Sequence, residues 1–159
     1  MAIFYYPIAL KLKQKNVLVV GGGRIAERKT RALLSFGARV KIVAPDFTEG
    51  ILGFSRRGRI SLANRRYGPE DLKGSSLVVA ATSDRKLNKK IGLDAARKGI
   101  WANVVDDTAA CGFISMAIIK KKGLVISIST DGKNPRLSKD FKEFLKRKID
   151  EFDSGRHKS

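Results

Sequence analysis

Two residues that are common in reactive sites are scarce in this sequence. Among its 159 residues, Cys111 is the single cysteine and His157 is the single histidine. These numbers exclude a disulfide within the chain and a Cys/His cage for a metal ion. His157 also lies in the polar segment 153–159. We therefore predict no metal site, and we expect proton chemistry to rest on carboxylates, lysines, tyrosines or hydroxyls.

Long apolar runs are also absent. Runs such as residues 17–20 and 77–81 are short, whereas a helix needs about 20 apolar residues to span a bilayer. Residues 1–8 lack the charged start and the long apolar core of a secretion signal. Because 43% of the residues are hydrophobic, a packed core is expected. We therefore expect a folded cytoplasmic protein that has no membrane partner.

Acidic residues are few, with 15 against 33 basic residues and a net charge of +18. Such a surplus attracts anions, and nucleic acids and anionic small molecules both fit it. The basic residues are spread along the chain, however, and most aromatic residues occupy expected core positions instead of alternating with basic ones. We therefore expect no nucleic-acid partner.

Strands and helices alternate through the first two thirds of the chain. Short apolar runs predict strands at residues 16–20, 39–44, 59–63, 76–81 and 100–105. Between them, the residue pattern favours helices at 24–36, 47–57 and 84–98, and a turn or short helix at 69–72. The first helix is expected to bury one face, formed by Ile25, Ala32, Leu33 and Phe36. This alternation predicts an α/β fold with a parallel sheet.

The pattern changes after Asp107. Residues 113–120 and 124–129 predict an antiparallel hairpin, and an amphipathic helix follows from about Pro135. We predict a Rossmann-type NAD-binding domain at residues 1–110, a hairpin–helix region at 111–150 and a disordered tail at 151–159. Exposed hairpin edges need cover, and a second subunit is a common way to provide it.

A glycine-rich turn joins the first strand to the first helix. Its sequence, Gly21-Gly22-Gly23-Arg24-Ile25-Ala26, matches the dinucleotide-binding pattern G-x-G-x-x-A. Gly21 permits the tight turn, Gly23 lets the backbone approach a pyrophosphate, and Ala26 lets the helix pack closely. The turn therefore predicts a dinucleotide site, with a glycine turn that binds no ligand as the alternative.

Polar residues follow the other strands at the edge where parallel sheets bind ligands. Pro45 and Asp46 come after the second strand, where an acidic residue often holds the ribose of NAD. Asp46 lies slightly late for that role, so NAD and NADP both stay open, and Asp46 could equally cap the next helix. Thr82 and Asn103, at the ends of the fourth and fifth strands, complete the expected cofactor contacts.

Two carboxylates, Asp106 and Asp107, follow the fifth strand. Crowded carboxylates can have their ionisation shifted into a range that suits proton transfer, while turn and capping chemistry is the alternative. Asp106 lies nearer the strand end and is the better candidate for proton transfer. Capping is the favoured interpretation of Asp107.

Several of these segments recur together in one family. In order along the chain they are Tyr6-Pro7-Ile8, residues 19–29, Ala80-Ala81-Thr82-Ser83-Asp84, Asn88, Asn103-Val104-Val105-Asp106-Asp107, Cys111, Phe113-Ile114 and residues 128–135. Over roughly residues 5–150, this ordered set resembles the precorrin-2 dehydrogenase/sirohydrochlorin ferrochelatase family. That family includes the amino-terminal part of multifunctional sirohaem synthases.

The resemblance implies NAD-dependent oxidation of precorrin-2 to sirohydrochlorin in sirohaem biosynthesis. It places NAD contacts on the glycine turn with Arg24 and Ile25, and on Pro45 and Asp46. It also makes Asp106 the catalytic aspartate. Ser129 and Thr130 would lie near the site and bind substrate carboxylates, although ordinary hairpin-end residues would look the same. The hairpin and the last helix would form a homodimer.

Two further expectations complete the hypothesis. Precorrin-2 is an anionic tetrapyrrole, so a strongly basic protein would attract it and neutralise its charge. Larger family members continue into a helical domain after the counterpart of Ile149, whereas this sequence stops at Ser159. We therefore expect dehydrogenase activity with weak or absent iron insertion. The main alternative is a regulatory module that senses NAD, catalyses nothing and has no use for Asp106.

Overall fold

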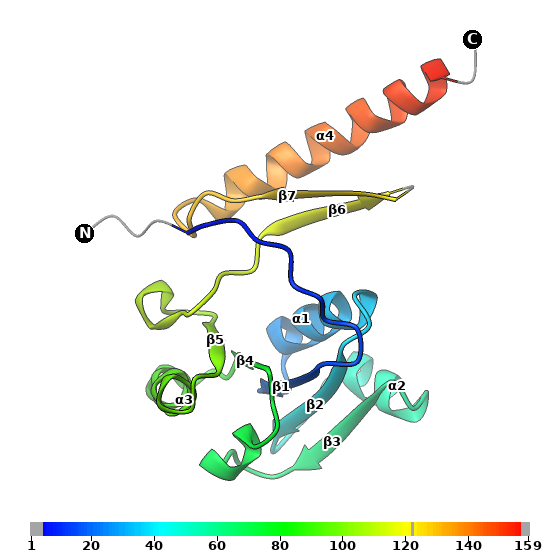
Figure 1. Cartoon of the computed structure of the whole chain (residues 1–159). Coiled ribbons are helices and arrows are strands. Elements are labelled where there is room, and N and C mark those ends of the chain that lie inside the picture. The colour runs from blue at the N-terminus through cyan, green and yellow to red at the C-terminus, as the bar shows by residue number, and fades with distance from the viewer. Residues whose placement is uncertain (1–4, 122, 157–159) are drawn as a thin grey trace. The chain divides into compact units, whose positions relative to one another are not determined.

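The computed structural model describes residues 5–121 and 123–156 and divides the chain into two compact units (Figure 1). Tyr6–Phe113 form the larger unit, and Tyr5 belongs with residues 114–156. The predicted first domain, residues 1–110, therefore differs at both ends from the unit in the structure. Within the described ranges, no helix has the length and apolar character needed to cross a membrane.

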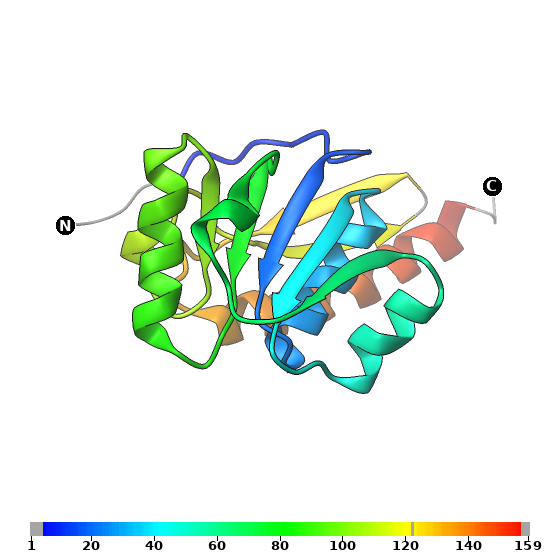
Figure 2. The same ribbon diagram turned by 90° about the horizontal axis from the view of Figure 1, so that it is seen from below.

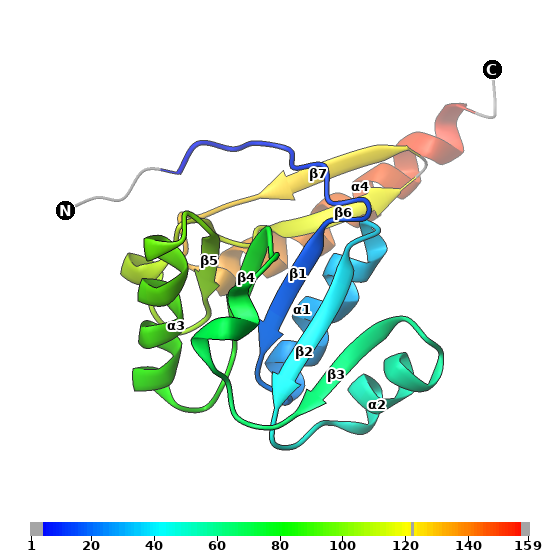
Figure 3. The ribbon, with the colours of Figure 1, turned by 60° about the horizontal axis from the view of Figure 1, so that its bottom comes forward.

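A five-stranded parallel sheet forms the centre of the larger unit (Figure 3). Its strands are β1 (Asn16–Val20), β2 (Arg39–Ala44), β3 (Ile60–Asn64), β4 (Leu77–Ala80) and β5 (Trp101–Val104), in the order β3-β2-β1-β4-β5. The chain thus moves outward from β1 in one direction and then continues from β4 in the other. The predicted Rossmann-type sheet is confirmed, with each strand boundary within one residue of its expected position.

Helices cover both faces of this sheet (Figures 1 and 2). Helices α1 (Arg24–Ser35) and α2 (Glu49–Arg56) pack on the face that Val17 and Val19 present. Leu18 and Val20 point to the opposite face, where α3 (Arg85–Arg97) and the 3₁₀ helix η1 (Pro69–Leu72) pack. A second 3₁₀ helix, η2 (Thr108–Ala110), follows β5. Because both faces are buried, β1 consists almost entirely of apolar β-branched residues and leucine.

The buried face of α1 differs from the predicted one. Ala26 and Thr30 are fully buried, whereas Ile25 is 45% exposed and Ala32 is also exposed. Leu33 is part of the observed face, which follows the spacing i, i+4, i+7 from Ala26. The helix begins so close to the sheet that only small side chains fit on its first turns, and Ile25 must point away.

The smaller unit contains an antiparallel hairpin and one long helix. The hairpin strands are β6 (Ala117–Lys121) and β7 (Leu124–Ile128), and α4 (Pro135–Arg156) packs along them. The first hairpin strand begins four residues later than predicted. Phe113 instead belongs to the larger unit, because its backbone N–H donates to the carbonyl of Ala102 at 3.3 Å.

Helix α4 also differs from its predicted length. The amide of Asn134 caps its start by accepting a hydrogen bond from the Leu137 N–H at 2.9 Å. The helix then continues to Arg156, so most of the predicted disordered tail is helical. An ion pair between Lys148 and Glu151, 2.7 Å long, joins neighbouring turns across the expected end. Residues 157–159 of the predicted tail lie outside the described residues.

Candidate cofactor site at the carboxyl edge of the sheet

The carboxyl edge is the edge of the sheet where the strands end and the glycine turn begins. Gly21 has a φ of +118°, and its N–H donates to the Val43 carbonyl at 2.9 Å. A Cβ on Gly21 would collide with the carbonyl of Ala81, and a Cβ on Gly22 would collide with that of Asp46. The packing of the chain itself therefore requires glycine at these two positions.

The fold does not require glycine at position 23. Its φ of −85° and ψ of −174° suit any residue, and a Cβ there would meet no atom within 4 Å. Gly23 is the N-cap of α1, and no side chain caps the exposed N–H groups of the first turn. The space in front of these donors thus stays clear, as an approaching pyrophosphate requires. This geometry fits the predicted dinucleotide.

The residues that flank the turn also face the open side. Arg24 and Ile25 are exposed on the first turn of α1, and Pro45 and Asp46 are exposed after β2. The two loops contact each other, because the Thr48 N–H donates to the Gly22 carbonyl at 2.9 Å. Pro45 and Asp46 therefore lie near the glycine turn, and their predicted contact with the cofactor stays a prediction.

The capping alternative for Asp46 is wrong. The residue that caps α2 is Thr48, whose hydroxyl accepts from the Ile51 N–H at 3.4 Å. Among the residues that the structure describes, the carboxylate of Asp46 has no hydrogen-bond or ion-pair partner. It is therefore available to ribose hydroxyls.

A hydrogen-bonded chain links β4 to β5 through α3. The Thr82 N–H donates to the Asn88 Oδ1 at 3.0 Å, and the Asn88 Nδ2 donates back to the Thr82 carbonyl at 3.0 Å. The same Nδ2 lies 3.2 Å from each carboxylate oxygen of Asp106. The side chain of Asp106 is 21% exposed, and Arg85 lies nearby with its Nε 3.7 Å from Oδ2. The Asp106 carboxylate is thus hydrogen-bonded to the buried Asn88 and partly exposed to solvent.

Asp107 and Asn103, which lie in the same sequence segment as Asp106, form hydrogen bonds within the protein. Asp107 caps η2 by accepting from the N–H groups of Ala109 and Ala110 at 3.0 and 3.2 Å, which confirms the capping interpretation. Asn103 is 5% exposed, and its Nδ2 donates to the Phe113 carbonyl at 3.2 Å. The cofactor contact expected of Asn103 stays a prediction, as does that of Thr82.

Three residues near this edge have properties that the sequence did not reveal. Burial raises the pKa of the Cys111 thiol, whose sulfur accepts from the Val104 N–H at 3.1 Å. Burial, with a smaller effect of Arg28, lowers the pKa of Lys29 to about 8. Asn88 is fully buried. A signal for Asn88 exists in the sequence, since it shares a helix face with the core residues Ile91 and Ala95, where a polar residue is unusual.

The residues predicted to bind substrate belong to the smaller unit. The Ser129 hydroxyl accepts from the Asp131 N–H at 3.1 Å. The Thr130 hydroxyl accepts from the Asn134 N–H at 3.1 Å and donates to its carbonyl at 3.0 Å. Both hydroxyls thus take part in the turn before α4. Their role in substrate binding stays a prediction.

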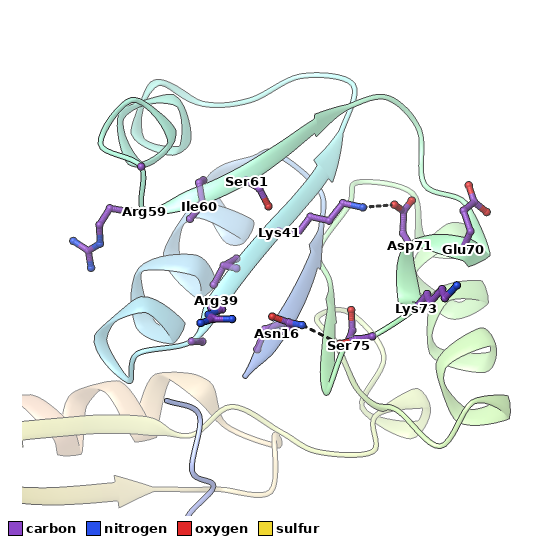
Figure 4. Close-up of a pocket in the computed structure, with 15 residues that line it drawn as sticks. Asn16, Arg39, Lys41, Arg59, Ile60, Ser61, Glu70, Asp71, Lys73 and Ser75 are labelled. Atoms are coloured by element: carbon purple, nitrogen blue, oxygen red, sulfur yellow. Dashed lines mark hydrogen bonds and ion pairs between the residues drawn. The ribbon is translucent and has the colours of Figure 1, made fainter. Parts of the chain in front are cut away.

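A cavity of about 570 Å³ lies at the opposite, amino edge of the sheet (Figure 4). Its lining includes the first residues of three strands, Asn16, Arg39 and Ile60. Four of its 15 lining residues are basic, which is close to the 33 of 159 in the whole chain. One of these four, Lys41, is paired with Asp71 at 2.8 Å. The cavity is therefore only slightly richer in basic residues than the whole chain, and its lining includes no predicted site residue.

The uncapped helix, the glycine turn and the strand order together define a dinucleotide-binding domain of the Rossmann type. Residues 8–117 match the protein family described as "Putative NAD(P)-binding". A solved structure of SirC, a precorrin-2 dehydrogenase, is 32% identical with a TM-score of 0.76, over 91% of this chain and 71% of that chain.

Curated relatives show the same similarity. The siroheme synthase of Chromobacterium violaceum is 39% identical and siroheme synthase 1 of Aeromonas salmonicida is 41% identical, each over 141 residues and 89% of this chain. The chain spans about 30% of the length of these relatives. The chain therefore belongs to the NAD(P)-binding family that includes SirC and the amino-terminal part of siroheme synthases. The resemblance drawn from the sequence is confirmed.

Proposed function

We propose that this chain catalyses the NAD-dependent dehydrogenation of precorrin-2 to sirohydrochlorin in sirohaem biosynthesis. One observation carries the proposal. The uncapped N-terminus of α1, behind Gly23, and the partly exposed carboxylate of Asp106 follow strands that end at the same edge of one sheet. This edge supplies both requirements of the reaction, a dinucleotide site and a proton acceptor. The activity named for SirC supports the choice of substrate.

Gly23, Asp46 and Asp106 have different roles in the proposed reaction. NAD would be held at the glycine turn and would supply the hydride acceptor for this reaction. The N–H groups of α1 bind the pyrophosphate, with Gly23 leaving room for it, and Asp46 accepts hydrogen bonds from ribose hydroxyls. The carboxylate of Asp106 takes the proton that the substrate loses together with the hydride. Hydride and proton together make up the two hydrogens that the dehydrogenation removes.

Substrate binding follows from charge and from the family. The net charge of +18 attracts an anionic tetrapyrrole and offsets its carboxylates. We assign Ser129 and Thr130 to the binding of those carboxylates, on the basis of the family resemblance. Replacing each hydroxyl, as Ser129→Ala and Thr130→Val, is expected to raise the KM for precorrin-2 more than it lowers kcat.

The deciding experiment is anaerobic turnover of enzymatically generated precorrin-2 with NAD. We expect the visible spectrum of sirohydrochlorin and an equal amount of NADH, and only when protein and NAD are both present. NADP should be a poorer acceptor, because its 2′-phosphate would meet the carboxylate of Asp46. NAD binding without product would contradict the proposal and favour a sensing module. Addition of ferrous ion to the product then tests iron insertion.

We assign a second copy of the chain to the apolar surface of the smaller unit. Leu137, Phe141 and Phe144 are 43–54% exposed and share one face of α4, and Leu124 and Val125 of β7 are 50 and 51% exposed. Patches of this kind commonly mark a protein interface. Sedimentation should show a dimer, and Phe141→Glu should convert it to a monomer. A wild-type monomer at micromolar concentration would contradict the assignment.

A further inference from the structure

The amide of Asn88 can take only one orientation. Its Oδ1 faces the Thr82 N–H and its Nδ2 faces the Thr82 carbonyl, each at 3.0 Å. A peptide N–H can only donate and a peptide carbonyl can only accept, so a flipped amide would lose both bonds. The backbone of Thr82 therefore determines which atom Asn88 turns toward Asp106.

The atom of Asn88 that faces Asp106 is the donor Nδ2. One hydrogen of the Asn88 Nδ2 serves the Thr82 carbonyl, and the other is left for Asp106, whose two oxygens lie 3.2 Å away. Because the two distances are equal, the hydrogen is shared by both oxygens on the inner side of the carboxylate. The remaining acceptor positions of Asp106 are not used by Asn88: the side chain is 21% exposed, and the Arg85 Nε lies 3.7 Å from Oδ2.

Asn88 cannot itself touch a substrate, because it is fully buried. Asn88 lies on α3, whose N-terminus is capped. The Asp84 carboxylate accepts from the N–H groups of Lys86 and Leu87 at 2.8 and 3.1 Å. A rigid helix thus holds the amide between the end of β4 and the carboxylate that follows β5. This arrangement supports a reacting group from behind.

We infer that Asn88 is a positioning residue, whose amide ties the Asp106 carboxylate to the Thr82 backbone and so aims Asp106 at the substrate. The inference rests on the proposed function, in which Asp106 accepts the proton. It adds a role in the reaction for a residue of α3 that contacts neither substrate nor cofactor.

Two substitutions of Asn88 test the inference. Asn88→Asp keeps the volume and the acceptor for the Thr82 N–H, but it replaces the donor with a second carboxylate that faces Asp106. Asn88→Ala removes the whole link. For both we expect kcat to fall roughly tenfold to hundredfold, as for the loss of a group that supports a reactive side chain. The KM for precorrin-2 and the Kd for NAD should change less than about threefold. In Asn88→Asp, the acid limb of kcat should also move to higher pH, because two crowded carboxylates hold a proton more tightly.

A double-mutant cycle separates positioning from a general structural role. In an Asp106→Ala background, Asn88→Ala should cause no further loss of kcat, because the carboxylate it aims is gone. Asn16→Ala is a control for the loss of an asparagine far from the site, since Asn16 is exposed at the amino edge and donates to the Gly74 carbonyl at 3.3 Å. This control should leave kcat unchanged.

The outcomes are distinct from those of the proposed function. A wild-type chain that binds NAD but yields no sirohydrochlorin overturns the proposed function and the role of Asn88 with it. With an active wild type, two results overturn the inference alone. One is unchanged kcat in Asn88→Asp that binds NAD normally, and the other is an equal loss from Asn88→Ala in both backgrounds.

Discussion

The two edges of the central sheet differ in how far their polar groups are satisfied. At the carboxyl edge, the first turn of α1 has no side-chain cap and the Asp106 side chain is 21% exposed. On η1, beside the cavity, the Asp71 side chain is 1% exposed and is bound by Lys41 of β2 and by Arg65, which follows β3, at 2.8 and 2.7 Å. The amino edge nevertheless has the cavity of about 570 Å³. In this protein, unsatisfied donors and acceptors therefore identify the candidate site better than cavity volume does.

The electrostatics of Asp71 explain the difference. Burial raises the pKa of Asp71, but hydrogen bonds from Arg65 and Lys41 outweigh burial and hold the pKa well below its usual range. Asp71 therefore stays charged at neutral pH, and its oxygens stay bound to Lys41 and Arg65. A carboxylate in this state stabilises the fold and has little left with which to bind a ligand.

The largest expected effect is on turnover, at the carboxyl edge. Asp106→Asn should lower kcat about a thousandfold, because the proton acceptor is lost, while the Kd for NAD stays the same. Asp107→Asn is the matched control, since asparagine can still cap η2, and it should keep near wild-type turnover. Steady-state kinetics and NAD titration measure both. Normal turnover in Asp106→Asn would remove Asp106 from the mechanism.

The next effect is on stability, at Asp71 beside the cavity. Asp71→Asn should cost about 2 kcal/mol of unfolding free energy, since it leaves Lys41 and Arg65 without a charge partner and both are partly exposed. Because folding lowers the pKa of Asp71, its contribution is complete at neutral pH and is lost as the pH falls below the ordinary value of 3.8. Urea unfolding at several pH values tests this. A large loss of kcat in the folded variant would contradict the contrast between the edges.

A smaller effect is expected on NAD binding, and it distinguishes Gly23 from Gly22. Gly23→Ser should weaken NAD binding about tenfold, because the serine hydroxyl would cap α1 and occupy the space left for the pyrophosphate. The unfolding free energy should stay level or rise by up to about 1 kcal/mol, since serine is a good N-cap. Gly22→Ser, by contrast, should lower stability, because a Cβ there meets the Asp46 carbonyl. Unchanged NAD affinity in Gly23→Ser would exclude the helix N-terminus as the pyrophosphate site.

The smallest effect concerns Lys29. Burial and Arg28 lower its pKa from 10.5 to about 8, so between these values the unfolded chain binds more protons than the folded one. The full shift corresponds to about 3 kcal/mol. Because the Lys29 side chain is only partly buried, we expect the free energy of unfolding to gain about 1 kcal/mol as the pH rises from 8 to 10.5. Lys29→Met should abolish this gain, as denaturant titrations across the window can measure. An identical gain in the variant would assign it to other groups.

The strands and the glycine turn were predictable from the sequence, because their signals are local. Five short apolar runs gave every strand of the sheet, and the pattern at residues 21–26 gave the dinucleotide turn. The buried face of α1 was not predictable from periodicity, because the close approach of the helix to the sheet decides that Ala26 and Thr30 point inward. The start of β6 was also missed, since Phe113 is tied to β5 by contacts that no local pattern reveals.

The sequence by itself determined the family, the order of strands along the chain and the candidate residues Gly23, Asp46 and Asp106. The strands and the candidate residues follow from residue type and spacing, which are properties of neighbouring positions, and the family follows from the resemblance of the ordered motifs along the chain. The tertiary structure alone decided that Asp71, 30 positions from Lys41, is already paired, and that Asn88 lies against Asp106. The reason is physical, because the partners of a buried polar group come from segments far apart in the chain that only folding brings together.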